Sequence, residues 1–371
     1  MIFHDKRCIP KSRGPGIIFA ALWLLTVTTA SAESRQEMLF FTSVDTFESF
    51  SESDPAVEDS FVRGTLDLLY SYSTDRFRFL AEYLLSSDEA ELERLKVGWA
   101  WRDNAMLWFG RTHTTSKHWT SEYHHGQYLQ TSITRPSLEE WEDDSGPIPS
   151  HVTGFSLDVR HELAGGASLN YVIGAGLSPG LGSEGLEPFD VLDPHSGNGL
   201  SVNFKVAYRP RAFEPLQVGV ISSINEMDVE SESSPALADL RQVDQFTIGV
   251  FVDWQWKKMR LISSFVHLDN DLEYVDETVN DSFDLGYVQL EYQPNDDITL
   301  FGRSDNGFGE DWSPYLRLLP DFISHRHMLG LRWDFADTQA LTVEIADTAQ
   351  QGEATDHEYF KELRLQWSAV F

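Results

Sequence analysis

Cysteine and long apolar runs are both scarce in this chain of 371 residues. The one cysteine, Cys8, precedes an apolar stretch near the N-terminus, and no later segment approaches the ~18 consecutive apolar residues of a transmembrane helix. Disulfide bonds, cysteine catalysis and membrane-spanning helices are therefore excluded from the chain after that stretch. Basic residues are also few, 28 Lys and Arg against 59 Asp and Glu, and a net charge of −31 argues against nucleic acid as a partner.

Residues 1–32 have the layout of a secretory signal peptide. Lys6, Arg7, Lys11 and Arg13 precede the apolar stretch GIIFAALWLLTVTTA, and ASA precedes Glu33. We predict that residues 33–371 form the mature protein, in which 24 basic and 58 acidic residues give a net charge of −34. An exported chain with 13% aromatic residues and no apolar helix is typical of a β-barrel in lipid.

Apolar and polar residues alternate along most of the mature chain, as in VRGTLDLLYSY from residue 62 and QFTIGVFVDWQW from residue 245. A period of two indicates β-strands with one apolar face. The pattern predicts sixteen antiparallel strands joined by short turns that alternate with long polar loops. Fourteen or eighteen strands remain open, because the pattern is weak near residues 38–50 and 214–225. The sixteen strands are expected to begin near residues 38, 62, 76, 92, 105, 151, 167, 199, 214, 242, 258, 282, 297, 325, 339 and 359.

Aromatic residues recur at the apolar end of the strands that run toward the short turns. Such a ring is expected at a lipid–water interface, where amphipathic rings favour the headgroup level. Seven of the eight positions are aromatic, and the eight are Tyr72, Trp101, Val159, Tyr208, Trp256, Tyr292, Phe335 and Phe371.

The last strand, LRLQWSAVF, places Leu363, Leu365, Trp367, Ala369 and Phe371 on one face. This terminus resembles that of Gram-negative outer-membrane porins, and GRTHTTSKHWTSEYHHGQYLQTSITRP is similar to a segment of porin-like proteins. The resemblance implies a transmembrane up-and-down barrel in the outer membrane of a Gram-negative bacterium. It also implies that the barrel assembly machinery reads Phe371, that lipids and lipopolysaccharide surround the barrel, and that the protein is a homotrimeric diffusion channel without enzymatic activity or cofactors.

The connection 114–150 is the third long loop and the longest. In porins the third loop folds into the lumen, and the resemblance implies the same here. Its acidic end, facing a basic wall on the second to fifth strands, would form a charged constriction that selects among small solutes. The predicted acidic residues are Glu139, Glu140, Glu142, Asp143 and Asp144, and the predicted basic residues are Arg63, Arg76, Arg78, Arg94, Lys96 and Arg111. The alternative is that the acidic stretch is a solvated loop tip.

The sequence leaves the choice between cations and anions open. The net charge favours cations, whereas a track continued by Arg160, Lys205, Arg209, Arg326 and Arg332 would favour anions.

Two alternatives to an open channel concern histidines. His118, His124 and His125 of the loop are candidate metal ligands, but no HxH or HExxH spacing supports them. An enzymatic barrel is the other alternative, because DPHSGNGLS from residue 193 holds His195 and Ser196. Adjacent residues point to opposite sides of a strand, which argues against catalysis by this pair. A soluble β-rich binding protein would instead pair its apolar faces in a core.

Overall fold

The structure is a computed structural model that describes residues 34–371 with several gaps. The residues outside the description are 1–33, 52–59, 88–89, 124–125, 143, 183–184, 190–198, 212–214, 230–236, 238, 311–312, 320 and 352–356. The predicted signal peptide lies outside the described residues, so its cleavage stays a prediction. Within the described ranges, no helix is both long enough and apolar enough to cross a membrane.

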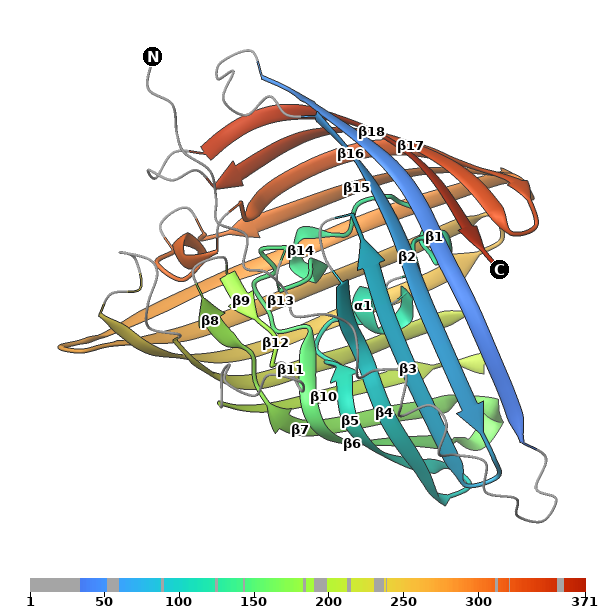
Figure 1. Ribbon diagram of the computed structural model, residues 1–371, viewed down its shortest axis with the longest axis horizontal. Helices are drawn as coiled ribbons and strands as arrows, with labels where there is room; N and C mark the ends of the chain where they lie inside the picture. Colours follow the sequence, from blue (N-terminus) through green and yellow to red (C-terminus); the bar gives the residue numbers. More distant parts are fainter. Residues whose placement is uncertain are drawn as a thin grey trace, which may run out of the picture.

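The described residues form a closed antiparallel barrel in which each strand pairs with its neighbour in the chain and β1 pairs with β18 (Figure 1). Its sixteen strands are β1 (Arg35–Phe50), β2 (Ser60–Ser73), β3 (Phe77–Ser86), β4 (Ala90–Arg102), β5 (Ala105–His113), β6 (His151–Glu162), β7 (Ser168–Leu177), β10 (Leu200–Arg209), β11 (Leu216–Asp228), β12 (Leu240–Trp256), β13 (Met259–Tyr274), β14 (Thr278–Asn295), β15 (Ile298–Phe308), β16 (Ile323–Ala336), β17 (Gln339–Gln351) and β18 (His357–Val370). Two further strands, β8 (Gly180–Gly182) and β9 (Gly185–Glu187), form a separate small sheet.

The sequence prediction of a sixteen-stranded barrel is confirmed. Every predicted strand start lies within four residues of the observed one, with the largest difference at β14, which begins at Thr278. The small sheet of β8 and β9 was not predicted, since its strands of three residues are too short to show alternation. The barrel therefore follows from the pattern of the sequence, while the structure within its loops does not.

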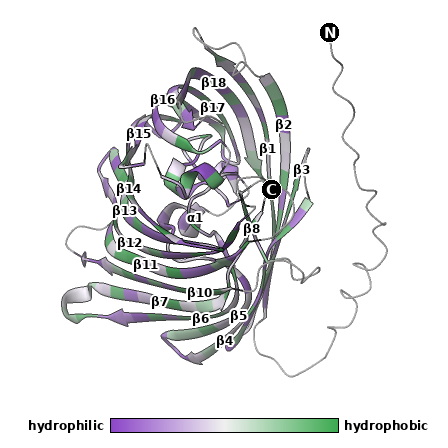
Figure 2. Ribbon diagram, turned by 90° about the vertical axis from the view of Figure 1, so that its left-hand side faces the viewer, coloured by the Kyte–Doolittle hydropathy of each residue, from purple (hydrophilic) through white to green (hydrophobic). Residues whose placement is uncertain are grey.

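Burial is reversed relative to a soluble protein. On β17 the apolar Val343 and Ile345 are exposed, whereas Thr342 and Glu344, which alternate with them, are buried. The same alternation of exposed apolar and buried polar residues marks β12, where Ile248 is exposed and Thr247 is buried. Hydrophobic and hydrophilic residues accordingly alternate along the ribbons (Figure 2). An apolar outer surface of this kind needs lipid as its solvent, and the polar side chains line the lumen.

The barrel closes where β18 meets β1. The backbone N–H of Phe371 donates to the carbonyl of Phe40 at 2.9 Å, and the N–H of Phe40 donates back at 3.0 Å. Both residues thus extend the ladder that seals the sheet, although recognition of Phe371 by an assembly machinery stays a prediction. Of the eight positions predicted to form the interfacial ring, the seven aromatic residues are exposed and Val159 is buried.

The predicted strict alternation of short turns and long loops is wrong at two places. Only residues 87–89 separate β3 from β4, and only residues 275–277 separate β13 from β14. At the second place the strands continue through a polar segment because Leu268 and Leu272 point inward and are fully buried in an apolar cluster with Phe283 and Tyr315. Packing at the barrel mouth therefore extends this hairpin beyond what alternation predicts.

A basic substitution on the outer face tests whether lipid solvates it. Ile345 on β17 is 56% exposed, and Ile345→Arg is expected to destabilise the barrel by about 2–4 kcal/mol in a bilayer. The matched control is Leu163→Arg, because Leu163 is 42% exposed but lies in the short turn between β6 and β7. Urea unfolding in lipid vesicles, followed by tryptophan fluorescence, measures the free energy of unfolding of both variants. Equal and small effects of the two substitutions would contradict the lipid-facing assignment.

Candidate pore constriction

Residues 114–150, called the inner loop below, leave the wall after β5 and return to it at β6. The inner loop contains the short helix α1 (His118–Tyr123) and two 3-10 turns, η3 (Gln127–Leu129) and η4 (Ser137–Glu139). Its Trp119, Leu138 and Ile148 are fully buried. Figure 2 shows α1 enclosed by the ring of strands, so the inner loop occupies the lumen. A long loop stays ordered only when it is packed and hydrogen-bonded in this way.

The inner loop is tied to the far side of the barrel by Arg303. This β15 side chain donates to the carbonyl oxygens of Thr134 and Arg135, both at 2.7 Å, and to the Thr134 hydroxyl at 2.8 Å. Its guanidinium also contacts Asp305 at 3.0 Å, and both side chains are fully buried. In the ring of sixteen strands β15 lies eight positions from β5, which is directly opposite. The inner loop therefore crosses the whole lumen.

Three more inward-facing side chains hold the inner loop. The Glu344 carboxylate on β17 accepts hydrogen bonds from the Ile133 and Thr134 backbone N–H groups and from the Thr134 hydroxyl. Arg332 on β16 donates to the carbonyls of Tyr128, at 2.8 Å, and Gln130. On β10, Lys205 donates to the Ser121 hydroxyl at 2.6 Å. Charged groups of the wall thus satisfy the backbone groups of a loop that has no sheet of its own.

The predicted acidic residues separate into two groups. Glu139 and Glu142 are fully buried and bond within the inner loop and its root. The Glu139 carboxylate accepts from the backbone N–H groups of His118 and Thr120, and Glu142 accepts from His151 and from the Ser150 N–H.

The remaining acidic candidates are closer to open space. Glu140 keeps a side-chain exposure of 19% and lies 3.6 Å from Arg326 of β16. Asp144 is exposed, and Asp143 lies outside the described residues. Of the predicted acidic residues that the structure describes, Glu140 and Asp144 are therefore the two that remain available to a passing solute.

Burial controls the titration of the inner loop. It lowers the pKa of Lys117 to about 8 and raises the pKa of Glu139. Burial also raises the pKa of Glu140, which nearby Arg326 only partly offsets, to about 7. For Glu142 burial acts in the same direction, but the adjacent His151 and the Ser150 N–H outweigh it, and the pKa is lowered.

Two members of the predicted basic wall are already paired. Arg94 on β4 is buried against Glu82 of β3, and Arg111 on β5 is buried against Glu91 of β4. Arg111 also donates to the carbonyls of Glu93, at 3.1 Å, and Phe189, at 3.2 Å. The wall therefore interleaves acidic and basic groups, and its electric field is weaker than six unpaired arginines and lysines would produce.

The other basic candidates differ in their surroundings. Lys96 on β4 is half-buried, with its ammonium 4.7 Å from the centre of the Trp108 ring. Arg63 on β2 is half-buried near Phe61, at 5.9 Å. Arg76 and Arg78 are exposed around the short turn between β2 and β3.

A cavity of about 180 Å³ lies between the wall and the root of the inner loop. Its lining includes Lys96 and Asp158 from the wall and Thr114 and Ser121 from the inner loop. The structure thus brings two of the predicted basic residues, Arg94 and Lys96, to a space that the inner loop borders, and Asp158 adds an acidic group there.

Of the three predicted metal ligands, the structure describes His118. The His118 ring stacks on Phe251 with centroids 4.0 Å apart, and its Nδ1 accepts from the Lys205 ammonium at 3.3 Å. Burial and this ammonium hold the pKa of His118 well below its usual value. A neighbouring cation disfavours a metal ion here, and His124 and His125 lie outside the described residues.

Arg303 and Glu344 were not predicted as anchors of the inner loop. Arg303 is flanked by Gly302 and Ser304, so no apolar alternation marks its face as inward. Glu344 carries a signal, since it stands alone between the apolar Val343 and Ile345. A single buried carboxylate on a lipid-backed strand indicates a partner in the lumen.

The amino-acid sequence matches no family model and no curated protein. Solved structures do match. An anion-selective porin from Comamonas acidovorans is similar with a TM-score of 0.63 and 12% identity over 91% of this chain and 100% of that one. The outer-membrane channel DcaP of Acinetobacter baumannii is similar with a TM-score of 0.59 and 10% identity, over 91% and 97%. OmpF of Salmonella typhi, solved with daunomycin, is similar with a TM-score of 0.57 and 11% identity, over the same shares.

The chain has the porin fold. The predicted resemblance to Gram-negative outer-membrane porins is confirmed at the level of architecture. A porin barrel with an apolar outer surface and a polar lumen indicates the outer membrane of a Gram-negative bacterium, as predicted.

The inner loop depends on Arg303, and Arg303→Met tests this. Loss of the guanidinium leaves buried Asp305 without its ion-pair partner and removes the bonds to Thr134 and Arg135, at a cost of about 3–5 kcal/mol. Arg364→Met is the control, because Arg364 pairs with Glu362 on β18. Urea unfolding in vesicles is expected to show the larger loss for Arg303→Met. Limited proteolysis is expected to cleave the inner loop in this variant alone; protection equal to the control would contradict the anchoring role.

Proposed function

We propose that this protein is a passive diffusion channel for small hydrophilic solutes or ions across the outer membrane. The observation that carries the proposal is a polar lumen crossed by one ordered loop. The inner loop narrows the barrel, because it is bonded to the wall opposite its own root. A narrowed, charged lumen in a lipid-backed barrel sorts solutes by size and charge.

The passage that we propose runs on the β4–β6 side, between the basic wall and the root of the inner loop. Lys96 supplies a positive charge there and Asp158 a negative one, while Arg94 is neutralised by Glu82. Glu140, which lies against Arg326 of β16 across the lumen, and Asp144 act on this passage through their charge at longer range. With both signs present, charge selectivity depends on single residues and not on the large net charge of the chain.

A channel is preferred to an enzymatic barrel for a chemical reason. His195 and Ser196 lie outside the described residues, and their adjacent positions still argue against a shared strand face. A homotrimer and contacts with lipopolysaccharide remain predictions that follow from the likeness to porins.

Conductance of the purified protein in a planar bilayer tests the proposal. The wild-type protein is expected to give stepwise ohmic currents, and Lys96→Glu is expected to shift the reversal potential in a salt gradient toward cation preference. The control is Lys258→Glu, which makes the same charge change in the exposed turn between β12 and β13. Absence of any current from correctly folded protein would refute the channel. Equal shifts in the two variants would remove Lys96 from the passage.

Glu140 makes selectivity depend on pH. Its pKa of about 7 leaves the side chain mostly neutral near pH 5 and mostly charged near pH 9. Raising the pH is therefore expected to add a negative charge beside Arg326 and to move the reversal potential toward cation preference, with a midpoint near pH 7. Glu140→Gln is expected to abolish this midpoint, whereas Asp144→Asn, in the same loop, is expected to keep a transition with a lower midpoint, because the charge of Asp144 raises the pKa of Glu140. A transition unchanged in Glu140→Gln would assign it to another group.

A further inference from the structure

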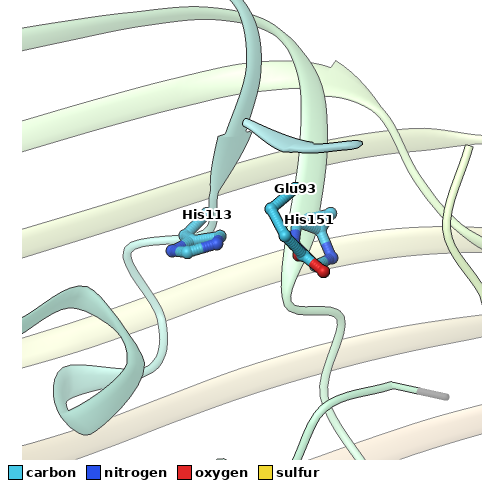
Figure 3. A group of neighbouring side chains, drawn as sticks. All are labelled: Glu93, His113 and His151. Atoms are coloured by element: carbon cyan, nitrogen blue, oxygen red, sulfur yellow. The ribbon is translucent and has the colours of Figure 1, made fainter. Parts of the chain in front are cut away.

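A cluster of three buried side chains lies at the root of the inner loop. Glu93 comes from β4, His113 is the last residue of β5, and His151 is the first residue of β6. The barrel register pairs His113 directly with His151, and the hydrogen bond from Arg111 to the Glu93 carbonyl brings β4 alongside. Figure 3 shows Glu93 and His151 together, with His113 at the same level. The cluster therefore stands where the inner loop leaves the wall and where it returns.

The donor atoms are close enough for one metal ion. One ligand atom from each residue lies within 4.8 Å of the others, and Glu93 Oε2 is 3.0 Å from His151 Nε2. Metal–ligand distances of about 2.0–2.2 Å place tetrahedral donors roughly 3.4 Å apart. The Glu93–His151 pair, at 3.0 Å, is already close to this spacing, and the His113 donor, within 4.8 Å of the others, must move closer to bind the same ion. The three residues come from rigid strands, which suits a preorganised site.

The orientation of His151 is set by a second carboxylate. Glu142 Oε1 contacts His151 Nδ1 at 2.9 Å and directs Nε2 toward Glu93. A carboxylate bound to the far nitrogen of an imidazole is the usual outer-shell partner of a metal-binding histidine, since it selects the tautomer and raises the basicity of the ligand. Trp141 stacks on the same ring, with the two centroids 5.5 Å apart, and so helps to hold its orientation.

Charge balance points in the same direction. Glu93 and Glu142 are both buried and contact His151 from two sides. A protonated His151 compensates one of these two negative charges, whereas a divalent cation between neutral imidazoles compensates both. Of the neighbouring cations, Arg111 pairs with Glu91, and Lys117, which donates to the Ser150 hydroxyl at 2.7 Å, offsets part of the charge of Glu142.

We propose that Glu93, His113 and His151 bind a divalent transition-metal ion, Zn²⁺ by the chemistry of the donor set, with Glu142 as the positioning residue for His151. Two imidazoles and one carboxylate form a common three-residue zinc set, and they exclude Mg²⁺ and Ca²⁺, which prefer oxygen ligands. His113 also lines the 180 Å³ cavity, which gives the ion a route from the lumen. Bound metal would join β4, β5 and β6 to Glu142 and so fasten both ends of the inner loop.

Titration of the purified protein with Zn²⁺ tests this proposal. Chelator-treated protein in detergent is titrated by isothermal calorimetry in excess Mg²⁺, which occupies exposed carboxylates. One saturable Zn²⁺ per chain is expected, and Glu93→Gln and His113→Gln are each expected to abolish it. Glu142→Gln is expected to weaken it 10–100-fold. His161→Gln, an exposed histidine in β6 that contacts Tyr171 at 3.0 Å, is expected to leave it unchanged.

The outcomes decide the proposal separately from the channel function. Circular dichroism and heat-dependent migration in gels establish that each variant is a folded barrel. If one of the two ligand variants does not fold, the other is enough for the test. Tetrahedral Co²⁺ absorption that disappears in Glu93→Gln or His113→Gln supports the site. Absence of saturable binding by the wild-type protein, or binding retained in a folded ligand variant, overturns it whatever the conductance.

Discussion

Closure of the backbone hydrogen-bond ladder is the constraint on which the rest of this structure depends. Hydrocarbon offers no partner to an N–H or carbonyl group, so a sheet can lie in lipid only if it has no free edge. The pairing of β1 with β18, extended by the reciprocal bonds of Phe40 and Phe371, removes that edge. Once the sheet is closed, alternate side chains must face lipid and lumen, and the chemistry of the interior follows.

The lumen differs from the core of a soluble protein, because it buries charged side chains. Charged groups such as Arg303, Asp305 and Glu344 are fully enclosed, yet each is paired or hydrogen-bonded. The inner loop provides many of the partners through its backbone, and its own peptide groups are satisfied in return. Loop and wall therefore stabilise each other, and a change at one anchor affects both the stability of the barrel and the width of the passage.

The candidate site could be predicted from the sequence in outline only. The loop 114–150 stands out by length, and Lys96 and Glu140 follow from alternation and charge. That Glu139 and Glu142 serve the loop itself, and that Arg94 and Arg111 are paired, depends on contacts between strands and loops distant in the sequence. Residue type alone could not separate a carboxylate that faces the passage from one that accepts backbone N–H groups.

The amino-acid pattern was enough to predict the barrel: sixteen strands in preference to fourteen or eighteen, the approximate start of each strand and the apolar outer face. The reason is that a period of two, repeated against lipid, is a local property that each segment carries independently. Tertiary structure alone decided which charges meet across the lumen, including the gathering of Glu93, His113 and His151 at the loop root. These contacts depend on the register between neighbouring strands and on the path of the inner loop. Both are set only when the whole sheet has closed.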